Sequence, residues 1–445
     1  MYIQSILQSK NTPKTISCQL KILISLSFFS VLTFYDSAKV SAVEEKKPTA
    51  QLSKDEKKLW EESAIFEKEL EKKGLIYHDS LLGDYISEIG QKLIPQDLKD
   101  SMIKFRFQVI KEPILNAYAF PNGSIYIHTG LLARIENEAQ LAHILGHEIA
   151  HVIQKHALKS YKNFRNKLIF ANVVDILGSA AVAGSNVNYL DFFDLGLGIT
   201  MSAAINGYGR ENEKEADDIG MQLMVKAGYQ PQEAPKIYEL FIKEYGDAAQ
   251  LEIFFYGSHP ANKERIKRTT EFLKTKYADK AKDITLIVNT EEFQQRTKFL
   301  IRENAILDIN TDRYNHAIAG LKKAITSNPE DPIAHYYLGE AHRLIVKYPE
   351  KVKEEEAQKR TTQKQKKKEM TSEEKEEKLS MALKEYNLAI SYDPQYAQPH
   401  KGLGLLYYEQ GKKEVAKDEF EKYLTLDPMA KDKRQIIKYL EELKK

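Results

Sequence analysis

The feature that most restricts the fold of this 445-residue chain is a repeat in its last third. Similar residues recur there at an offset of 34 positions: Ala382 and Ala416, Tyr386 and Phe420, and Pro394 and Pro428. This is the period of tetratricopeptide repeats, in which each unit is a pair of helices. One helix pair cannot bury its apolar face alone, so neighbouring pairs stack. The sequence therefore predicts an α-solenoid over residues 297–445.

A charged segment interrupts these repeats. Leu338-Gly339 recurs as Leu403-Gly404, at an offset of 65 positions instead of 34, which leaves an excess of 31 residues. The excess coincides with residues 350–378, which hold ten Lys or Arg and nine Asp or Glu in 29 positions. A segment so rich in charge is typical of solvated structure. We interpret it as an insertion within one repeat, either a solvated helical extension or a flexible loop.

The N-terminus has the pattern of an export signal. Lysines precede a polar-poor run over residues 22–35, and Val40-Ser41-Ala42 follows it. A charged region, an apolar region of about fourteen residues and a small-residue site together describe a signal peptide over residues 1–42. The alternative is a retained N-terminal anchor. The only cysteine, Cys18, lies inside this segment, so a metal site in the mature chain must use His and carboxylates.

The charge balance argues against nucleic acid as a partner. The whole chain has a formal charge of +2, and removal of residues 1–42 takes away four Lys and one Asp, which leaves +2 − 3 = −1. Nucleic-acid binding requires a clustered basic surface, which a nearly neutral chain does not indicate.

The region before the repeats changes its hydrophobic period twice. Helical spacing over Ser53–Leu70 and Leu81–Ile94 gives way to alternation between residues 105 and 127, with a turn at Pro121-Asn122-Gly123. Helical spacing then returns over Ile135–Leu158 and Arg210–Ala227. We expect a mainly α domain over residues 43–275 with a small antiparallel β-sheet, joined to the repeats by a linker at 276–296.

An Ala-, Gly-, Leu- and Phe-rich stretch, Phe170–Ala204, separates the last two of these helices. It is predicted to be a buried helical hairpin of the domain. The alternative is a mobile cover or an element that touches the membrane, although four polar residues within it exclude a clean membrane span.

The first chemical motif is His147-Glu148-Ile149-Ala150-His151. Residues four apart on a helix share one face, so His147 and His151 can hold one Zn²⁺ through their imidazoles. Glu148 lies beside them, where its carboxylate can take a proton from an attacking water. This motif predicts a metal-dependent hydrolase with one zinc ion per chain.

A catalytic zinc site requires a third protein ligand. Arg210, Glu213, Asp217 and Gly220 form one stripe on the second helix. Glu213 is placed to bind the metal, Asp217 one turn later to accept a hydrogen bond from a ligand imidazole, and Gly220 to permit close helix packing. We assign Arg210 with Asp217 to the surroundings of the ligands. The alternative is a solvated charged helix face.

These motifs resemble a known family. Residues 57–275 are similar to the gluzincin-type zinc metallopeptidase family that includes HtpX and the prenyl-protein endopeptidases. The resemblance implies that Glu213 is the third ligand and that His259 approaches the metal site. There His259 would stabilise the transition state or occupy the open zinc position; alternatively, it caps a helix that begins at Pro260. The motifs are Asn-Ala-Tyr-Ala-Phe-Pro at 116–121, Leu-Gly-His-Glu-Ile-Ala-His at 145–151, Arg-x-x-Glu-x-Glu-Ala-Asp at 210–217 and Ser-His-Pro at 258–260.

Two further histidines lie near the first motif. His143 is one turn before His147 on the same helix face, and we interpret it as a core or supporting side chain and not as a ligand. His156 is five residues after His151, so it is predicted to point elsewhere and receives no role.

The sheet offers a place for substrate. A peptide could add to a free sheet edge as an extended strand, held by main-chain hydrogen bonds. We predict that this edge consists of Asn116, Ala117, Tyr118, Ala119 and Phe120 and faces the metal cleft.

Together these features predict an exported zinc metalloendopeptidase that cleaves misfolded or unassembled envelope proteins. The family resemblance implies a periplasmic role in the quality control or assembly of outer-membrane proteins, with an assembly machine bound through the repeats and peripheral contact with the membrane. The alternative is a non-cleaving chaperone or scaffold that acts through the repeats and carries a latent zinc site.

Overall fold

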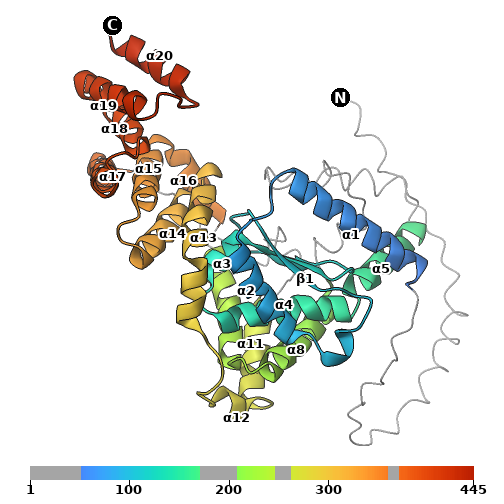
Figure 1. Ribbon diagram of the computed structural model, residues 1–445. Coiled ribbons are helices and arrows are strands. Elements are labelled where there is room, and N and C mark those ends of the chain that lie inside the picture. The colour runs from blue at the N-terminus through green and yellow to red at the C-terminus, as the bar shows by residue number, and fades with distance from the viewer. Residues whose placement is uncertain (1–51, 171–207, 246–261, 359–369, 445) are drawn as a thin grey trace, which may run out of the picture. The chain divides into compact units, whose positions relative to one another are not determined.

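The computed structural model (Figure 1) describes residues 52–170, 208–245, 262–358 and 370–444. Most of these residues are helical, and three short strands form one sheet. Within the described ranges, no helix has both the length and the apolar character needed to cross a membrane. The predicted signal segment and nearly all of Phe170–Ala204 lie outside the described residues.

The region before the repeats begins with the two predicted helices, and local side chains fix where each starts. Ser53 accepts the backbone N–H of Glu56, whose carboxylate in turn accepts the N–H of Ser53, and Asp79 caps the second helix through the N–H of Leu82. The bounds are α1 Lys54–Lys72, α2 Ser80–Leu93, η1 Gln96–Leu98, β1 Arg106–Ile110, β2 Ala117–Ala119, β3 Ser124–His128, α3 Thr129–Arg134, α4 Glu138–Ile153, α5 His156–Phe170, α8 Arg210–Lys226, η2 Pro231–Glu233, α9 Ala234–Tyr245, α11 Asn262–Lys274 and α12 Ala278–Ala281.

The sheet has the strand order β1-β3-β2 and is mixed, so the prediction of a purely antiparallel sheet is wrong for one pair. β2 and β3 form an antiparallel hairpin, in which Ala119 pairs with Ile125 across a turn where Gly123 has φ +91°. β1 lies parallel to β3, with Phe107 opposite Ile125. Alternating apolar residues indicate a strand but not the direction of its neighbour, so the sequence could not distinguish the two arrangements.

The two faces of the sheet are covered by different helices (Figure 1). Phe66 and Leu70 of α1 pack with Tyr118, Phe120 and Tyr126 on one face. The opposite face packs against α2 and α4. Because side chains alternate along a strand, these two cores draw on alternate residues of the same strands. Residues packed on the second face include Phe107, Ala117, Ala119, Ile125 and Ile127.

Helices α4 and α8 carry the two chemical motifs and pack closely on each other. A Cβ atom added at Gly146 of α4 would lie 2.9 Å from the carbonyl oxygen of Gly220 on α8. A Cβ atom at Gly220 would lie 2.8 Å from the backbone nitrogen of His147. Every residue of α4 from Glu138 to Val152 is buried. The helix of the first motif therefore runs through the core, with the second motif against it.

The repeats form as predicted. Helices α13 and α14, α15 and α17, and α18 and α19 pack as pairs, and α20 packs on the last pair. Tyr386 and Phe420, the aromatic residues that recur at the repeat offset, pack between neighbouring helices. The Tyr386 ring lies against Gly339 and Gly402, and the Phe420 ring lies against Gly404. The bounds are α13 Thr290–Asn310, α14 Tyr314–Ser327, α15 Pro332–Lys347, α16 Pro349–Gln358, α17 Ser372–Tyr392, α18 Gln398–Glu409, α19 Lys413–Leu426 and α20 Lys433–Leu443.

The charged segment 350–378 follows α15, includes nearly all of α16 and extends into the start of α17, and its first part is packed. Val352 of α16 is buried in the apolar core of the repeats. Glu355 is also buried, and its carboxylate accepts the backbone N–H groups of Asn315 and His316 at the start of α14. Residues 359–369 lie outside the described residues. A wholly solvated insertion is therefore wrong for α16, because two of its residues carry contacts that overall charge does not reveal.

Helix α13 also packs on the core that α2 and α4 share, through Phe293, Leu300 and Ile301. Polar contacts join the same parts: Arg134 of α3 lies 3.1 Å from a carboxylate oxygen of Asp308. The first repeat thus shares buried contacts with the region that precedes it.

Candidate metal centre

Three buried side chains from the two motifs converge on one point. His147 Nε2 and His151 Nε2 are 2.9 Å apart, and the carboxylate oxygens of Glu213 lie 3.5 Å from each. The three residues are at most 4% exposed. Their ligand atoms all lie within 4.8 Å of one another. The structure therefore brings together the three residues predicted as ligands.

The chemistry of this set fits a metal ion. Two imidazoles and one carboxylate are the donor set of many catalytic zinc sites, and ligand atoms around a tetrahedral zinc lie about 3.3 Å apart. The observed separations of 2.9 to 3.5 Å are of that size. Glu148, the predicted general base, lies beside His147 on α4 and is buried. The site can thus hold a metal ion, and a buried carboxylate follows one of its ligands on the same helix.

The outer nitrogen of His147 is held by Asp217. His147 Nδ1 lies 2.9 Å from Asp217 Oδ1, the arrangement expected for a carboxylate that orients a ligand imidazole. Burial raises the pKa of Asp217, but the charge of Arg265 and the bond to His147 outweigh it and hold that pKa well below its usual range. Asp217 is therefore a buried carboxylate that stays ionised.

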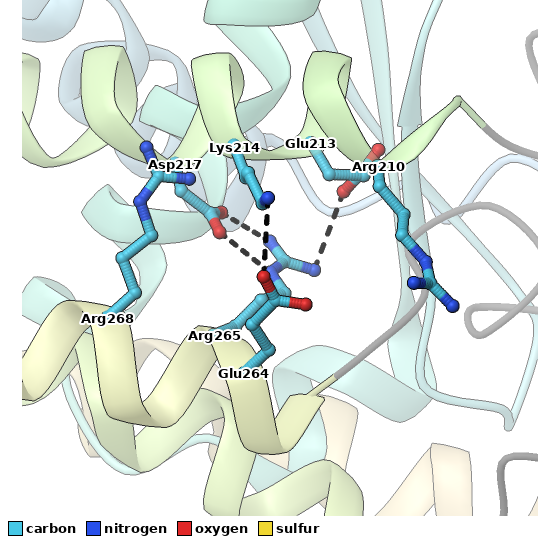
Figure 2. A pocket seen from close by; sticks show the side chains of 7 residues that line it. All are labelled: Arg210, Glu213, Lys214, Asp217, Glu264, Arg265 and Arg268. Carbon is cyan, nitrogen blue, oxygen red and sulfur yellow. Dashed lines mark hydrogen bonds and ion pairs between the residues drawn. The ribbon is translucent and has the colours of Figure 1, made fainter.

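Arg265 of α11 supplies the counter-charge, and Figure 2 shows it between α8 and α11, directed at Glu213 and Asp217. Its Nε donates to Asp217 Oδ2 at 2.9 Å, and a second nitrogen donates to Oδ1 at 2.5 Å. A third nitrogen lies 3.6 Å from Glu213. Such a two-point pair between a guanidinium and a carboxylate fixes both partners. Sequence reasoning missed Arg265, because it lies 118 residues from His147 and carries no local signal.

His143 belongs to the same network through Tyr238. Its Nε2 lies 2.7 Å from the Tyr238 hydroxyl, which donates to Asp217 Oδ1 at 3.0 Å. Burial lowers the pKa of His143 to about 3, so the ring is neutral. The structure thus places His143 behind Asp217, as a supporting side chain and not a ligand.

His156 lies against the metal centre, contrary to the prediction that it points elsewhere. Its Nδ1 is 2.7 Å from His151 Nδ1, and its Nε2 is 3.1 Å from Glu215 Oε2. The prediction assumed one continuous helix, whereas α4 ends at Ile153 and α5 begins at His156. The outer nitrogen of His151 therefore has a partner, as that of His147 does.

The predicted substrate strand is at the edge of the sheet, since β2 pairs only with β3 among the described strands. All five of its residues, Asn116 to Phe120, are buried. Tyr208 lies beside it: its ring stacks on His151 with centroids 4.0 Å apart, and its hydroxyl is 3.5 Å from the carbonyl oxygen of Ala119. The edge strand and the metal centre are therefore linked by one tyrosine.

The remaining predicted residues have different positions. Arg210 is exposed at the start of α8, where it lines a small pocket with Glu213, Lys214 and Arg268, and Figure 2 shows its guanidinium directed away from Asp217. His259 lies outside the described residues, so the structure says nothing of its position.

Known protein families match two regions of this chain, the region with the metal centre and the region with the repeats. Residues 81–272 match peptidase family M48, and residues 375–411 and 402–428 match tetratricopeptide repeat families. The chain thus carries a peptidase M48 domain followed by tetratricopeptide repeats. The M48 match includes both chemical motifs, on α4 and α8, and it also includes Arg265 of α11.

Curated relatives match over the same region. The beta-barrel assembly-enhancing protease of Yersinia pestis is 32% identical over 168 residues, which are 37% of this chain and 33% of the relative. The mitochondrial metalloendopeptidase OMA1 of Schizosaccharomyces pombe is 29% identical over 199 residues, 44% of this chain and 54% of the relative. The beta-barrel assembly-enhancing protease of Escherichia coli strain K12 is 28% identical over 180 residues, 38% of this chain and 34% of the relative. Each match therefore spans between a third and about half of the relative.

Among solved structures, the first TPR of Spaghetti (RPAP3) bound to an HSP90 peptide matches at a TM-score of 0.25 and 16% identity. The match covers 34% of this chain and 94% of that chain. A similarity at this level says nothing about function.

Proposed function

We propose that this chain is a zinc metalloendopeptidase. The observation that carries the proposal is the convergence of His147, His151 and Glu213 on one buried point. Glu148 follows His147 on the same buried helix. The M48 match over the same residues supports it. Three protein ligands leave a fourth position open for water or substrate, which is the property that separates catalytic from structural zinc sites.

Each residue of the site has a separate role in the proposed reaction. When bound, zinc supplies Lewis-acid activation of the attacking water and of the scissile carbonyl. Glu148 takes the proton of that water and later returns it to the leaving amine. Asp217 and Arg265 hold His147 in place, so the ligand does not reorient during the reaction.

Substrate would bind along β2. An extended peptide could pair with the outer edge of Asn116–Phe120 through main-chain hydrogen bonds, which recognise an unfolded segment more than one side chain. The buried state of this edge and the Tyr208 hydroxyl near Ala119 mean that neighbouring groups must move before a peptide binds. This requirement favours substrates with long unfolded segments over short peptides.

We further propose export to the periplasm and a role in the quality control or assembly of outer-membrane proteins. The support is the signal-like sequence of residues 1–42 and the similarity of the catalytic region to proteins named beta-barrel assembly-enhancing protease. The repeats would bind unfolded clients or an assembly machine, because stacked helix pairs offer an extended surface to other proteins.

The second candidate function is a chaperone or scaffold that does not cleave. The repeats and the closed edge strand favour it, whereas a catalytic carboxylate beside a three-ligand set has no purpose in a scaffold. His259 bears on this choice, because a nearby imidazole can close the open zinc position. If His259 closes it, His259→Ala retains zinc and raises cleavage; if it stabilises the transition state, the same change lowers cleavage on the order of a hundredfold.

The deciding experiment is cleavage of casein, a loosely folded substrate, by the full chain. We expect cleavage that stops when a chelator removes the metal and returns when zinc is added back. Zinc-loaded protein that leaves casein intact, both as the natural sequence and as His259→Ala, but suppresses the aggregation of an unfolded protein would favour the chaperone.

A further inference from the structure

A chain of hydrogen-bonded side chains runs from His151 away from the metal ligands. His151 Nδ1 contacts His156 Nδ1 at 2.7 Å, and His156 Nε2 contacts Glu215 Oε2 at 3.1 Å. Lys159 Nζ lies 3.4 Å from the same oxygen of Glu215. His156 is completely buried, whereas the Glu215 side chain is 41% exposed. The chain thus connects a buried ligand to a carboxylate at the surface.

The metal-facing nitrogen fixes where the protons of this chain lie. His151 Nε2 faces His147 and Glu213, so its lone pair is the one available to a metal. A neutral imidazole that binds through Nε2 carries its proton on Nδ1, and this N–H donates to His156 Nδ1. The proton of a neutral His156 is then on Nε2, where it donates to Glu215. Each ring is held in one tautomer by the acceptor beyond it.

A break in the helix makes this contact possible. In a continuous helix, five residues correspond to about 140° of rotation, which would direct His156 away from His151. Instead, Lys155 has φ +53° between the end of α4 and the start of α5. A left-handed backbone costs a residue other than glycine about 1 kcal/mol. The Lys155 side chain donates to Glu56 of α1 at 2.6 Å, which holds the turn in place.

The two ligand histidines are therefore supported in different ways. His147 contacts a carboxylate directly, and that carboxylate is ion-paired with Arg265. The outer nitrogen of His151, Nδ1, reaches the carboxylate of Glu215 through a second imidazole, that of His156. In metalloenzymes, partners of this kind orient the ligand, and their loss lowers metal affinity about 10- to 100-fold.

We propose that His156 and Glu215 are positioning residues that hold His151 in the orientation and tautomer that bind the metal. The proposal rests on the proposed function, since it assumes that His151 is a ligand. It assigns a role to a histidine outside the cluster of three candidate ligands. His156 is the nearer partner and has the larger effect; Glu215 acts through His156.

A pair of substitutions separates hydrogen bonding from packing. His156→Asn places a side-chain oxygen close to the position of the imidazole Nδ1, so an acceptor for the His151 N–H remains. His156→Leu has a similar size but offers no acceptor, so the hydrogen bond from the His151 N–H to residue 156 is lost. Glu215→Gln weakens the end of the chain, and Glu211→Gln, one turn earlier on α8 and 87% exposed, is its matched control.

The measurement is the zinc affinity of the full chain, obtained by competition with a chromophoric chelator, together with thermal unfolding of the metal-free protein. We expect His156→Leu to bind zinc about 10- to 100-fold more weakly than the natural sequence, with metal-free unfolding unchanged. His156→Asn should recover most of that loss. Glu215→Gln should lose several-fold in affinity, and Glu211→Gln should match the natural sequence.

Natural zinc affinity in His156→Leu, or an equal loss in the Leu and Asn variants, would overturn the proposal. If His156→Leu does not fold, the comparison of Glu215→Gln with Glu211→Gln decides, and equal affinities overturn it. If the natural sequence itself binds no zinc, the proposed function fails as well. Zinc binding that is normal in every variant refutes only the positioning role.

Discussion

Gly146 of α4 and Gly220 of α8 face each other so closely that a methyl group on either would meet the backbone of the other helix, at 2.9 Å and 2.8 Å. This contact sets the distance between the helix that carries His147 and His151 and the helix that carries Glu213. The metal site therefore depends on two glycines that do not bind metal.

Gly220→Ala should separate the two helices. The added methyl group would lie against backbone and not against a flexible side chain, so we expect a loss of about 1 to 3 kcal/mol in the free energy of unfolding. Zinc affinity should fall as well, because Glu213 moves relative to the histidines. Urea unfolding and chelator competition measure both. The matched control is Gly83→Ala on α2, where no atom from outside the adjacent helix backbone lies within 4 Å of the added carbon. It should be neutral or stabilise the protein by up to about 1 kcal/mol. Equal effects of the two changes would contradict the account of the helix contact.

Arg265→Met should destabilise the protein strongly. The change leaves Asp217 buried and ionised without its counter-charge, which costs on the order of 3 to 5 kcal/mol for a buried pair. The control is Arg268→Met, on the same helix, whose partner Asp218 is 34% exposed. Loss of that pair should cost less than about 1 kcal/mol. Urea unfolding of both variants gives the comparison. A loss for Arg265→Met no larger than that of Arg268→Met would mean that the buried pair is not a structural support of the site.

Glu355→Gln should destabilise the repeats. Glu355 accepts two backbone N–H groups at the start of α14 and contacts His316, so a weaker neutral acceptor should cost about 1 to 2 kcal/mol. The neighbouring Glu354, whose side chain is 67% exposed, is the control, and Glu354→Gln should have almost no effect. Thermal unfolding tests this. If Glu355→Gln unfolds at the same temperature as Glu354→Gln, α16 does not contribute to the fold.

Glu112 should make stability depend on pH. Burial raises its pKa to about 7, although Arg313 opposes the shift. Because the folded pKa is above the unfolded one, the folded state holds the proton more tightly, and this contribution is complete below about pH 4.5. It is lost as the pH rises through 7. Relative to Glu112→Gln, the natural protein should lose about 3 kcal/mol in the free energy of unfolding between pH 4.5 and 8. If the free energies of unfolding of the two proteins change with pH in parallel, the pKa of Glu112 is not raised in the folded state.

Much of the site follows from helical spacing. His147 and His151 share a face because they are four residues apart, and Glu213 and Asp217 repeat that spacing on α8. Once both helices are predicted, the site also requires that their two motif-bearing faces pack against each other. Gly220 indicates such a close approach. The repeats were predictable for a similar reason, since their period is visible in the chain.

The missing parts depend on contacts that no local pattern carries. Arg265 reaches Asp217 from α11, and an arginine in an exposed-looking sequence gives no indication of burial. His156 was misplaced because a left-handed residue at Lys155 ends one helix and begins another, and lysine does not signal such a turn. Val352 and Glu355 were hidden in a segment whose average composition is that of a solvated one. In each case the decisive contact is made with a residue distant in sequence or depends on a backbone conformation that the local sequence does not indicate.

Glu148 is the proposed base of a zinc peptidase, and one variant tests this role directly. Glu148→Gln removes the base but no metal ligand, so zinc content measured on the purified full chain should equal that of the natural sequence. Casein cleavage, measured on the same preparation, should be almost abolished. Glu211→Gln replaces an exposed carboxylate of α8 with an amide in the same way, and this control should retain both zinc content and casein cleavage. Natural cleavage by zinc-loaded Glu148→Gln would contradict the assignment of the base, and loss of zinc in that variant would contradict the assignment of the ligands.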